Sequence, residues 1–151
     1  MRAVIQRVSK AEVRVSEVTV GEIERGFLVL LGIAAGDTAR DAAAIATKIG
    51  GLRVFPDETG RMNIDLAAIG GAVLLVSQFT LIADVRKGRR PSFVGAADPE
   101  EAALLVGEVA MHLNAAGFEV ATGEFGAHME VSLVNDGPVT IVIDSIDGSI
   151  S

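Results

Sequence analysis

The chain has 151 residues, half of them apolar, which is enough for one domain with a substantial core. It has no cysteine, which excludes disulfides and thiol chemistry. It has no apolar run near the roughly 20 residues of a membrane helix, which excludes membrane-spanning helices. We therefore expect a cytoplasmic protein. The net charge of −7 disfavours a general nucleic-acid binder, because such proteins usually carry a basic excess.

The first fifth of the chain is predicted to be strand, followed by a helix. Residues 2–15 alternate in part between two faces, and the apolar run at 27–33 is typical of a central strand buried on both faces. A helix is predicted over 36–51, where Asp37 or Thr38 can cap the first turn and two glycines can stop the last.

The remaining elements are a short strand at 52–55, a buried strand over 72–83 that is either continuous or interrupted at Ser77-Gln78, a second helix, and further strands up to residue 144. The second helix has the clearest start, since Asp98 can cap it and Pro99 suits its first position. The tail predicts no regular structure.

This order of elements indicates the α+β class. We expect a β-rich mixed or antiparallel sheet that curls into a partial barrel, with two main helices packed against it. A single domain is predicted over residues 1–145, and residues 146–151 are expected to be a frayed tail.

The residues for metal and phosphate chemistry are few. His112 and His128 are the only histidines, they are not in metal-ligand spacing, and we interpret them as surface or interface residues, with no metal and no cofactor. The loop between residues 32 and 38 joins a strand to a helix but lacks the lysine and serine or threonine of a phosphate-binding loop.

Polar residues at the end of a buried strand form the first candidate site. Ser77 and Thr80 carry hydroxyls that could act as nucleophiles, but no base is near them in the sequence. The alternative is that they satisfy main-chain groups at the strand end.

A second candidate is the segment "NDGPVT" at 135–140. Gly137-Pro138 interrupts strand-forming sequence, and proline cannot donate to a ladder. A cis bond before proline, which costs only about 0.5–1 kcal/mol, would turn main-chain carbonyls outward. A purely structural turn is the alternative.

A third candidate is the basic run at 86–90. Its positive charges come from Arg86, Lys87, Arg89 and Arg90. The run is either a solvated loop or a local phosphate contact on an otherwise acidic protein.

Several segments together resemble the D-aminoacyl-tRNA deacylase family, collinearly over about residues 1–144. The segments that carry the resemblance are "MRAVIQRVSKAEV" (1–13), "RVFPDETGRMN" (53–63), "VSQFTLIAD" (76–84), "RKGRRPSF" (86–93) and "VSLVNDGPVT" (131–140). The resemblance implies a homodimer that hydrolyses the ester between a D-amino acid and the terminal adenosine of tRNA, with glycyl-tRNA as a further candidate substrate.

The resemblance also implies roles for the candidate residues. Gly137 and Pro138, joined by a cis bond, would enter the active site of the partner subunit and exclude L-amino acids by main-chain contact. Arg7 would help to hold this element. The ester would be lined by four residues of the other subunit, Ser77, Gln78, Phe79 and Thr80.

The chain departs from the family where Ile82 replaces a frequent tyrosine and His128 replaces a frequent aspartate. Neither position is in the core motifs. Two other functions are weighed: a non-catalytic dimeric RNA- or ligand-binding module, and a serine or threonine esterase that acts on small esters.

Overall fold

A computed structural model describes residues 1–151. The strands are β1 (Arg2–Val15), β2 (Val18–Ile23), β3 (Gly26–Gly32), β4 (Phe55–Pro56), β5 (Met62–Ile64), β6 (Ala72–Ser77), β7 (Glu119–Thr122), β8 (Glu130–Ile146) and β9 (Ser149–Ile150). The helices are α1 (Ala39–Gly51), the short 3-10 helix η1 (Phe79–Ile82) and α2 (Pro99–Ala115). No helix has the length and apolar character needed to cross a membrane.

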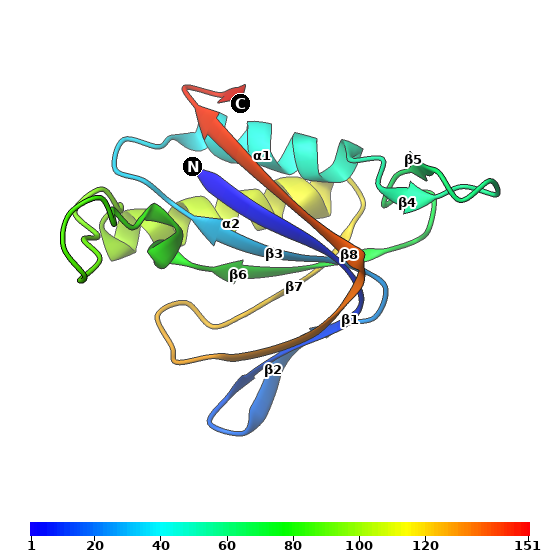
Figure 1. The fold of residues 1–151 in the computed structure, drawn as a ribbon, viewed down its shortest axis with the longest axis horizontal. Coiled ribbons are helices and arrows are strands. Elements are labelled where there is room, and N and C mark those ends of the chain that lie inside the picture. Colours follow the sequence, from blue (N-terminus) through cyan, green and yellow to red (C-terminus); the bar gives the residue numbers. More distant parts are fainter.

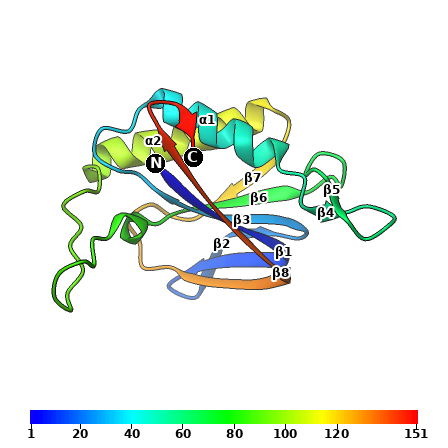
Figure 2. The same ribbon diagram turned by 45° about the horizontal axis from the view of Figure 1, so that its top comes forward.

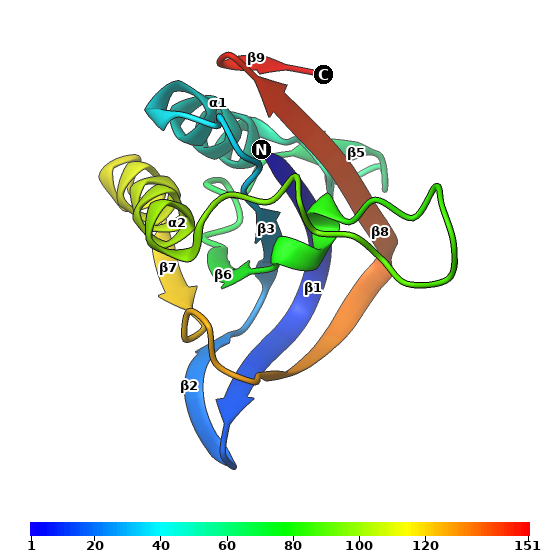
Figure 3. The ribbon, with the colours of Figure 1, turned by 90° about the vertical axis from the view of Figure 1, so that its left-hand side faces the viewer.

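The main sheet has seven strands in the order β7-β6-β3-β1-β8-β9, and β2 pairs with β1. The β3–β6 and β6–β7 pairs are parallel, whereas β1 is antiparallel to β2, β3 and β8. Both helices cover one face, and the lower parts of β1, β2 and β8 curl away on the other (Figures 1, 2 and 3). The predicted α+β class, with two helices on a sheet that forms a half-barrel, is confirmed.

The curl divides the apolar residues between two cores. The larger core lies under the helices and contains Ala3 and Ile5, whereas the smaller contains Val8 and Val13. Val8 faces away from Ala3 and Ile5 by the ordinary alternation of a strand, and Val13 joins Val8 because the register of β1 shifts on either side of Val8. As predicted, β3 is buried on both faces, because it lies between the two cores.

The helices begin largely as the sequence predicts. Thr38 is the N-cap of α1 and forms a capping box with Asp41. Asp98 is the N-cap position of α2 and Pro99 its first residue, although the Asp98 side chain makes no capping hydrogen bond. The buried stripe of α2 includes Leu105 and Leu113, which pack into the larger core.

Two strands differ from the prediction. The strand expected at 52–55 is reduced to the pair Phe55–Pro56, which forms a small hairpin with β5. The strand expected over 72–83 ends at Ser77 and continues as η1, so the interrupted alternative is correct.

The strand expected near residues 117–125 is present as β7, but the two segments on either side of Gly137-Pro138, expected as separate strands, form a single strand. β8 runs from Glu130 to Ile146, and β1 pairs with it on both sides of Gly137-Pro138. A long antiparallel partner can hold both halves in one strand despite a local interruption, because each half keeps its own ladder hydrogen bonds.

The tail is also ordered and not frayed. β9 folds back on the end of β8, and Ser151 and Asp144 exchange two main-chain hydrogen bonds, of 2.9 and 3.1 Å. The hairpin docks on the start of α1, where the Gly148 N–H donates to the carboxylate of Asp41. This contact joins residues 107 positions apart, so no local pattern could reveal it.

Candidate functional site

The Gly137-Pro138 segment forms a bulge in β8. Thr140 pairs with Gln6 and Asn135 with Val8, so the four residues between them lie opposite Arg7 alone. The bond between Gly137 and Pro138 is cis, as expected. Neither residue has a ladder partner on β1, and no side chain donates to either carbonyl oxygen. The bulge therefore offers two main-chain acceptors at an exposed surface.

Arg7 anchors the bulge from β1. Its side chain is buried, Nε donates to the Asp136 carbonyl over 2.7 Å, and Nη1 donates to the Val54 carbonyl. The Asp136 carboxylate adds an ionic contact 3.7 Å from Nε. A buried guanidinium requires such partners, because leaving its donors unpaired would be costly. Arg7 thus ties the bulge to the segment that leads into β4.

Only glycine fits at position 137. Its φ is +155°, and a Cβ there would lie 2.6 Å from the Val139 nitrogen and 2.8 Å from the Val139 Cγ2. Val139 cannot move away easily, since its side chain is buried in the larger core.

The Ser77–Thr80 segment leaves the sheet at the end of β6. The Gln78 N–H donates to the Leu31 carbonyl over 2.8 Å, which fixes the chain as it turns into η1. The Gln78 side chain donates to Thr80 Oγ1, so an amide and no base contacts the Thr80 hydroxyl. The N–H groups of Phe79 and Thr80 open η1, where a helix leaves its first donors without internal partners.

An apolar cavity of about 690 Å³ adjoins this segment. Ser77, Gln78 and Phe79 line one side of it, together with residues of the loop before α2 and of the loop before β8. Phe79 and Phe93 pack edge to face at its rim, with ring centroids 5.0 Å apart, and both rings are exposed. A cavity with exposed aromatic rings suits a flat aromatic group such as a nucleobase, which can stack on them.

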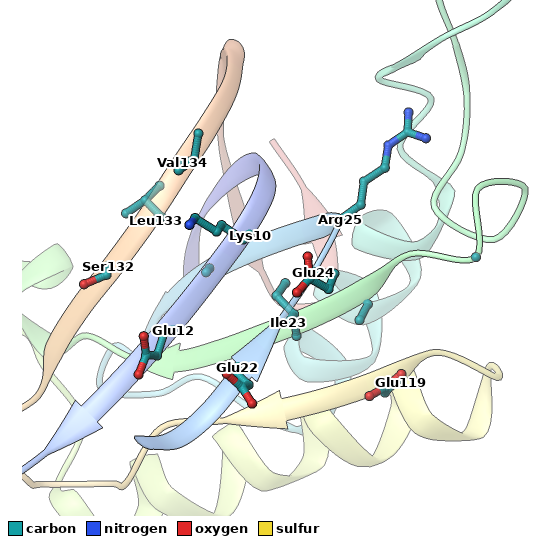
Figure 4. A pocket seen from close by; sticks show the side chains of 13 residues that line it. Lys10, Glu12, Glu22, Ile23, Glu24, Arg25, Glu119, Ser132, Leu133 and Val134 are labelled. Atoms are coloured by element: carbon teal, nitrogen blue, oxygen red, sulfur yellow. The ribbon is translucent and has the colours of Figure 1, made fainter. Parts of the chain in front are cut away.

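A second cavity of about 700 Å³ lies between β1, β2 and β8 (Figure 4). Glu12, Glu22, Glu24 and Glu119 contribute its carboxylates, partly balanced by two basic side chains. This lining would repel phosphates, so it does not suit an RNA end. No group of three or more metal-ligating side chains is arranged around an ion site in the structure.

The basic run forms an exposed loop joined to the Ser77–Thr80 segment. Asp84 and Ser92 exchange main-chain hydrogen bonds of 2.7 and 2.9 Å, which close the loop at its base. Arg86 folds back on the Asp84 carboxylate at 2.6 Å, which lowers the pKa of Asp84 and raises that of Arg86. Arg89 and Arg90 make no ion pair and stay available for another anion.

The two parts of the predicted site lie apart within the chain. Ser77 is level with Leu31 and Ala3, whereas the bulge is level with Arg7, four residues further along β1. That is about 13 Å along the strand, and three strand spacings, about 14 Å, separate β6 from β8. Figure 1 shows η1 at one end of the sheet and the bend of β8 at the other.

Some of the lining was not predicted from the sequence. The far wall of the apolar cavity includes Phe93, Phe125 and His128. These residues come from loops that have no periodic pattern of apolar residues. The one sequence feature that could have indicated the cavity wall was an aromatic residue beside a glycine in a loop, as at Phe125-Gly126. His128, which we expected at a surface, is exposed and lines the cavity, whereas His112 does not.

The chain is similar to known proteins over nearly its whole length. The D-Tyr-tRNA(Tyr) deacylase family model matches residues 4–144. A D-aminoacyl-tRNA deacylase of Chloroflexus aurantiacus is 57% identical over 147 residues, covering 97% of this chain and 92% of the relative. One from Desulfatibacillum aliphaticivorans is 54% identical over 145 residues, covering 96% and 99%.

Solved structures agree on the fold. The c-Myc DNA Unwinding Element Binding Protein superimposes with a TM-score of 0.91 at 39% identity, covering 97% of this chain and 99% of that one. A probable eukaryotic D-amino acid tRNA deacylase gives a TM-score of 0.81 at 17% identity, with 93% and 97% covered. The family match over nearly the whole chain is decisive, and the chain belongs to the D-Tyr-tRNA(Tyr) deacylase family.

Proposed function

We propose that the protein hydrolyses the ester bond of D-aminoacyl-tRNA to release tRNA and the D-amino acid. The observation that carries the proposal is the anchored main-chain bulge at Gly137-Pro138, whose two carbonyl oxygens have no side-chain donor, in a chain of the deacylase family. Main-chain carbonyls are suited to accept hydrogen bonds from the ammonium group of an aminoacyl ester, because a charged donor strengthens such bonds. The substrate would place the protein in the cytoplasm.

Chirality would be selected by exclusion. Main chain held by Arg7 leaves no space for a side chain on the L side of the α-carbon, whereas a D side chain would point out of the site. Such a clash discriminates against the abundant wrong substrate without requiring recognition of any one side chain. Glycyl-tRNA has no side chain to exclude, so we propose it as a second substrate.

The active site would form between two copies of the chain. Because η1 and the bulge lie at opposite ends of one sheet, the bulge can meet a Ser77–Thr80 segment only in another subunit. A two-fold dimer would place each bulge against the partner's segment and form two equivalent sites. The exposed rings at the rim of the apolar cavity would accept the terminal adenosine beside the ester.

Hydrolysis would depend on main-chain donors more than on a protein nucleophile. The N–H groups that open η1 would stabilise the oxyanion, and the ribose 2′-hydroxyl of the substrate would help to activate water. Thr80 would position the ester, because the only polar side chain that contacts its hydroxyl is the Gln78 amide, which is not a base.

This mechanism predicts a small effect for Thr80→Ala and a large effect for a change in the RNA. We expect single-turnover deacylation by Thr80→Ala to fall by no more than about tenfold, the equivalent of one ordinary hydrogen bond. A substrate ending in 2′-deoxyadenosine should react at least about 100-fold more slowly with the wild-type protein. Loss of all activity in Thr80→Ala, with full activity on the deoxy substrate, would favour a threonine nucleophile.

The basic loop is proposed to contact tRNA phosphates close to the ester. The double variant Arg89→Ala/Arg90→Ala should weaken binding and flatten the plot of log binding constant against log salt concentration by about 1.5. The matched control is Arg40→Ala/Lys48→Ala, which removes two exposed charges from α1. Equal slopes for the two double variants would show that the loop makes no special phosphate contact.

One assay separates the proposed function from the alternatives. The protein is incubated with D-aminoacyl-tRNA, with L-aminoacyl-tRNA and with a free D-amino acid ester, and release of the amino acid is followed. Hydrolysis of the D-aminoacyl-tRNA alone is expected. Hydrolysis of the free ester would indicate a general esterase, and tRNA binding without hydrolysis would indicate a binding module.

A further inference from the structure

We propose that Asn135 is a positioning residue for chiral selection, because its side-chain amide takes the place of a strand partner and sets the Gly137-Pro138 bulge. The inference rests on the proposed deacylase function. It assigns a role to a residue that the sequence suggested only as part of a turn.

The bulge removes Val139 from the ladder. β1 resumes pairing only at Thr140, so the main-chain N–H and C=O of Val139 lack the partner that an uninterrupted strand would have. The Asn135 side chain supplies both partners. The Val139 N–H donates to Oδ1 over 2.7 Å, and Nδ2 donates to the Val139 carbonyl over 3.1 Å.

This paired contact fixes the orientation of the amide. A main-chain N–H can only donate, so Oδ1 must face the Val139 nitrogen and Nδ2 must face the carbonyl. Nδ2 also lies 3.2 Å from Thr140 Oγ1, which accepts from Gln6 Nε2 over 3.4 Å. The amide is therefore connected to β1 through a second residue.

Three contacts together determine where the bulge projects. Arg7 holds the carbonyl of Asp136 at its start, Asn135 holds both polar groups of Val139 at its end, and the Val139 side chain is buried in the core. Between them lie the carbonyls of Gly137 and Pro138, which accept from no side chain and are the groups proposed to face the substrate. Arg7 fixes the main chain where the bulge begins, at Asp136, and Asn135 fixes it where the bulge ends, at Val139. Losing either contact should shift the two carbonyl oxygens.

Asparagine is suited to this role by its size and by carrying both a donor and an acceptor. Aspartate keeps the shape and the acceptor, but it turns an anionic oxygen toward the Val139 carbonyl, and two acceptors repel. A protonated aspartic acid restores the pattern, since its hydroxyl can donate to the carbonyl and its other oxygen can accept from the N–H. This gives a test that a purely structural role would not satisfy.

The experiment compares wild-type protein, Asn135→Asp and the control Asn114→Asp, an exposed asparagine at the end of α2 whose side chain makes no hydrogen bond. Deacylation of D- and L-aminoacyl-tRNA is measured between pH 4 and pH 8, so that the range reaches the usual aspartate pKa of about 3.9, together with thermal unfolding. We expect Asn135→Asp to lower the ratio of D to L hydrolysis by at least about tenfold at pH 8, since a displacement of about 1 Å in a site can cost about 100-fold. The ratio should recover toward the wild-type value as the pH falls, and Asn114→Asp should match the wild type throughout.

The outcomes are distinguishable. If Asn135→Asp keeps the wild-type ratio of D to L hydrolysis at pH 8, or loses it without recovery at low pH, the inference is wrong while the deacylase function stands. If the wild-type protein hydrolyses neither ester, the proposed function itself fails. A variant that is merely less stable would lose both activities in proportion to its unfolded fraction, leaving the ratio unchanged.

Discussion

Gly137→Ala should reduce deacylation of D-aminoacyl-tRNA by at least about 100-fold, because small displacements of groups that hold the substrate are costly. The added Cβ would lie 2.6 Å from the Val139 nitrogen, closer than real Cβ contacts, and the φ of +155° is one that L side chains rarely adopt. Since Val139 is anchored in the core, the bulge must move instead, and with it the two carbonyl oxygens proposed to bind the ammonium group.

The measurement is single-turnover hydrolysis with saturating protein, accompanied by thermal unfolding to show that the variant is folded. Gly107→Ala is the matched control, because Gly107 lies in the middle of α2 and a Cβ there meets no atom within 4 Å. That control should keep full activity and gain about 0.5–1 kcal/mol in free energy of unfolding, as expected for glycine to alanine in a helix. A folded Gly137→Ala protein with wild-type activity would remove the bulge from the mechanism.

The sequence predicts best where local chemistry determines the structure. Asp98 and Pro99 mark the start of α2 because capping positions and a first-turn proline act within one turn of the helix. The run at 27–33 predicts a central strand because only a strand covered on both sides needs apolar residues at every position. The break after Ser77 was one of two alternatives, and the hydrogen bond from the Gln78 N–H to the Leu31 carbonyl is the last main-chain bond between this segment and β3 before η1 begins.

The prediction from sequence fails where the local structure depends on contacts with residues far away in the chain. The continuity of β8 through Gly137-Pro138 depends on its pairing with β1, more than 120 residues earlier in the chain. The hairpin at the end of the chain depends on Asp41, which no local pattern connects to Ser145 and Gly148. The hydrogen bonds of Asn135 were hidden for a different reason. The run Asn135-Asp136-Gly137 is also an ordinary turn signal, so the sequence alone cannot distinguish the two uses of the asparagine.

The candidate site was predicted in parts but not as a whole. The family resemblance named Ser77 to Thr80, Gly137 and Pro138, and the structure supplies the cavity beside the first group and the anchors of the second. The resemblance placed the two groups in different subunits, and the strand register supplies a physical reason, because it separates them within one chain. That separation is the physical reason to expect a dimeric enzyme.

Asp41→Asn should lower the free energy of unfolding by about 3 kcal/mol, because hydrogen bonds to a buried charged group are worth about 1.5–3 kcal/mol each and unpaired donors add a penalty. The buried Asp41 carboxylate accepts from the N–H and hydroxyl of Thr38, over 2.9 and 3.0 Å, and from Ser145 Oγ and the Gly148 N–H, over 2.7 and 2.9 Å. All four partners are donors, so an amide must turn its own NH2 group toward two of them. Chemical denaturation gives the difference, and Glu101→Gln, an exposed acid in the first turn of α2, should cost only about 0.3–1 kcal/mol.

The effect of Asp41→Asn should also depend on pH, in a direction that follows from the pKa of Asp41. Burial opposes ionisation, but the hydrogen bonds from Gly148, Ser145 and Thr38 outweigh it and hold the pKa of Asp41 well below its usual value.

A carboxylate whose pKa is depressed in the folded state stabilises the protein when the pH is above the unfolded-state pKa of about 3.9. That stabilisation is lost as the pH falls below this value, because the unfolded chain then binds more protons than the folded one. The difference between wild type and Asp41→Asn should therefore be constant from pH 5 to pH 8 and shrink from about pH 4 toward pH 2, as the wild-type protein loses this contribution. The other carboxylates with lowered pKa values, Asp57, Asp84 and Asp144, are present in both proteins and cancel in the difference. A difference that stays constant down to pH 2 would mean that the charge of Asp41 does not hold the C-terminal hairpin on α1.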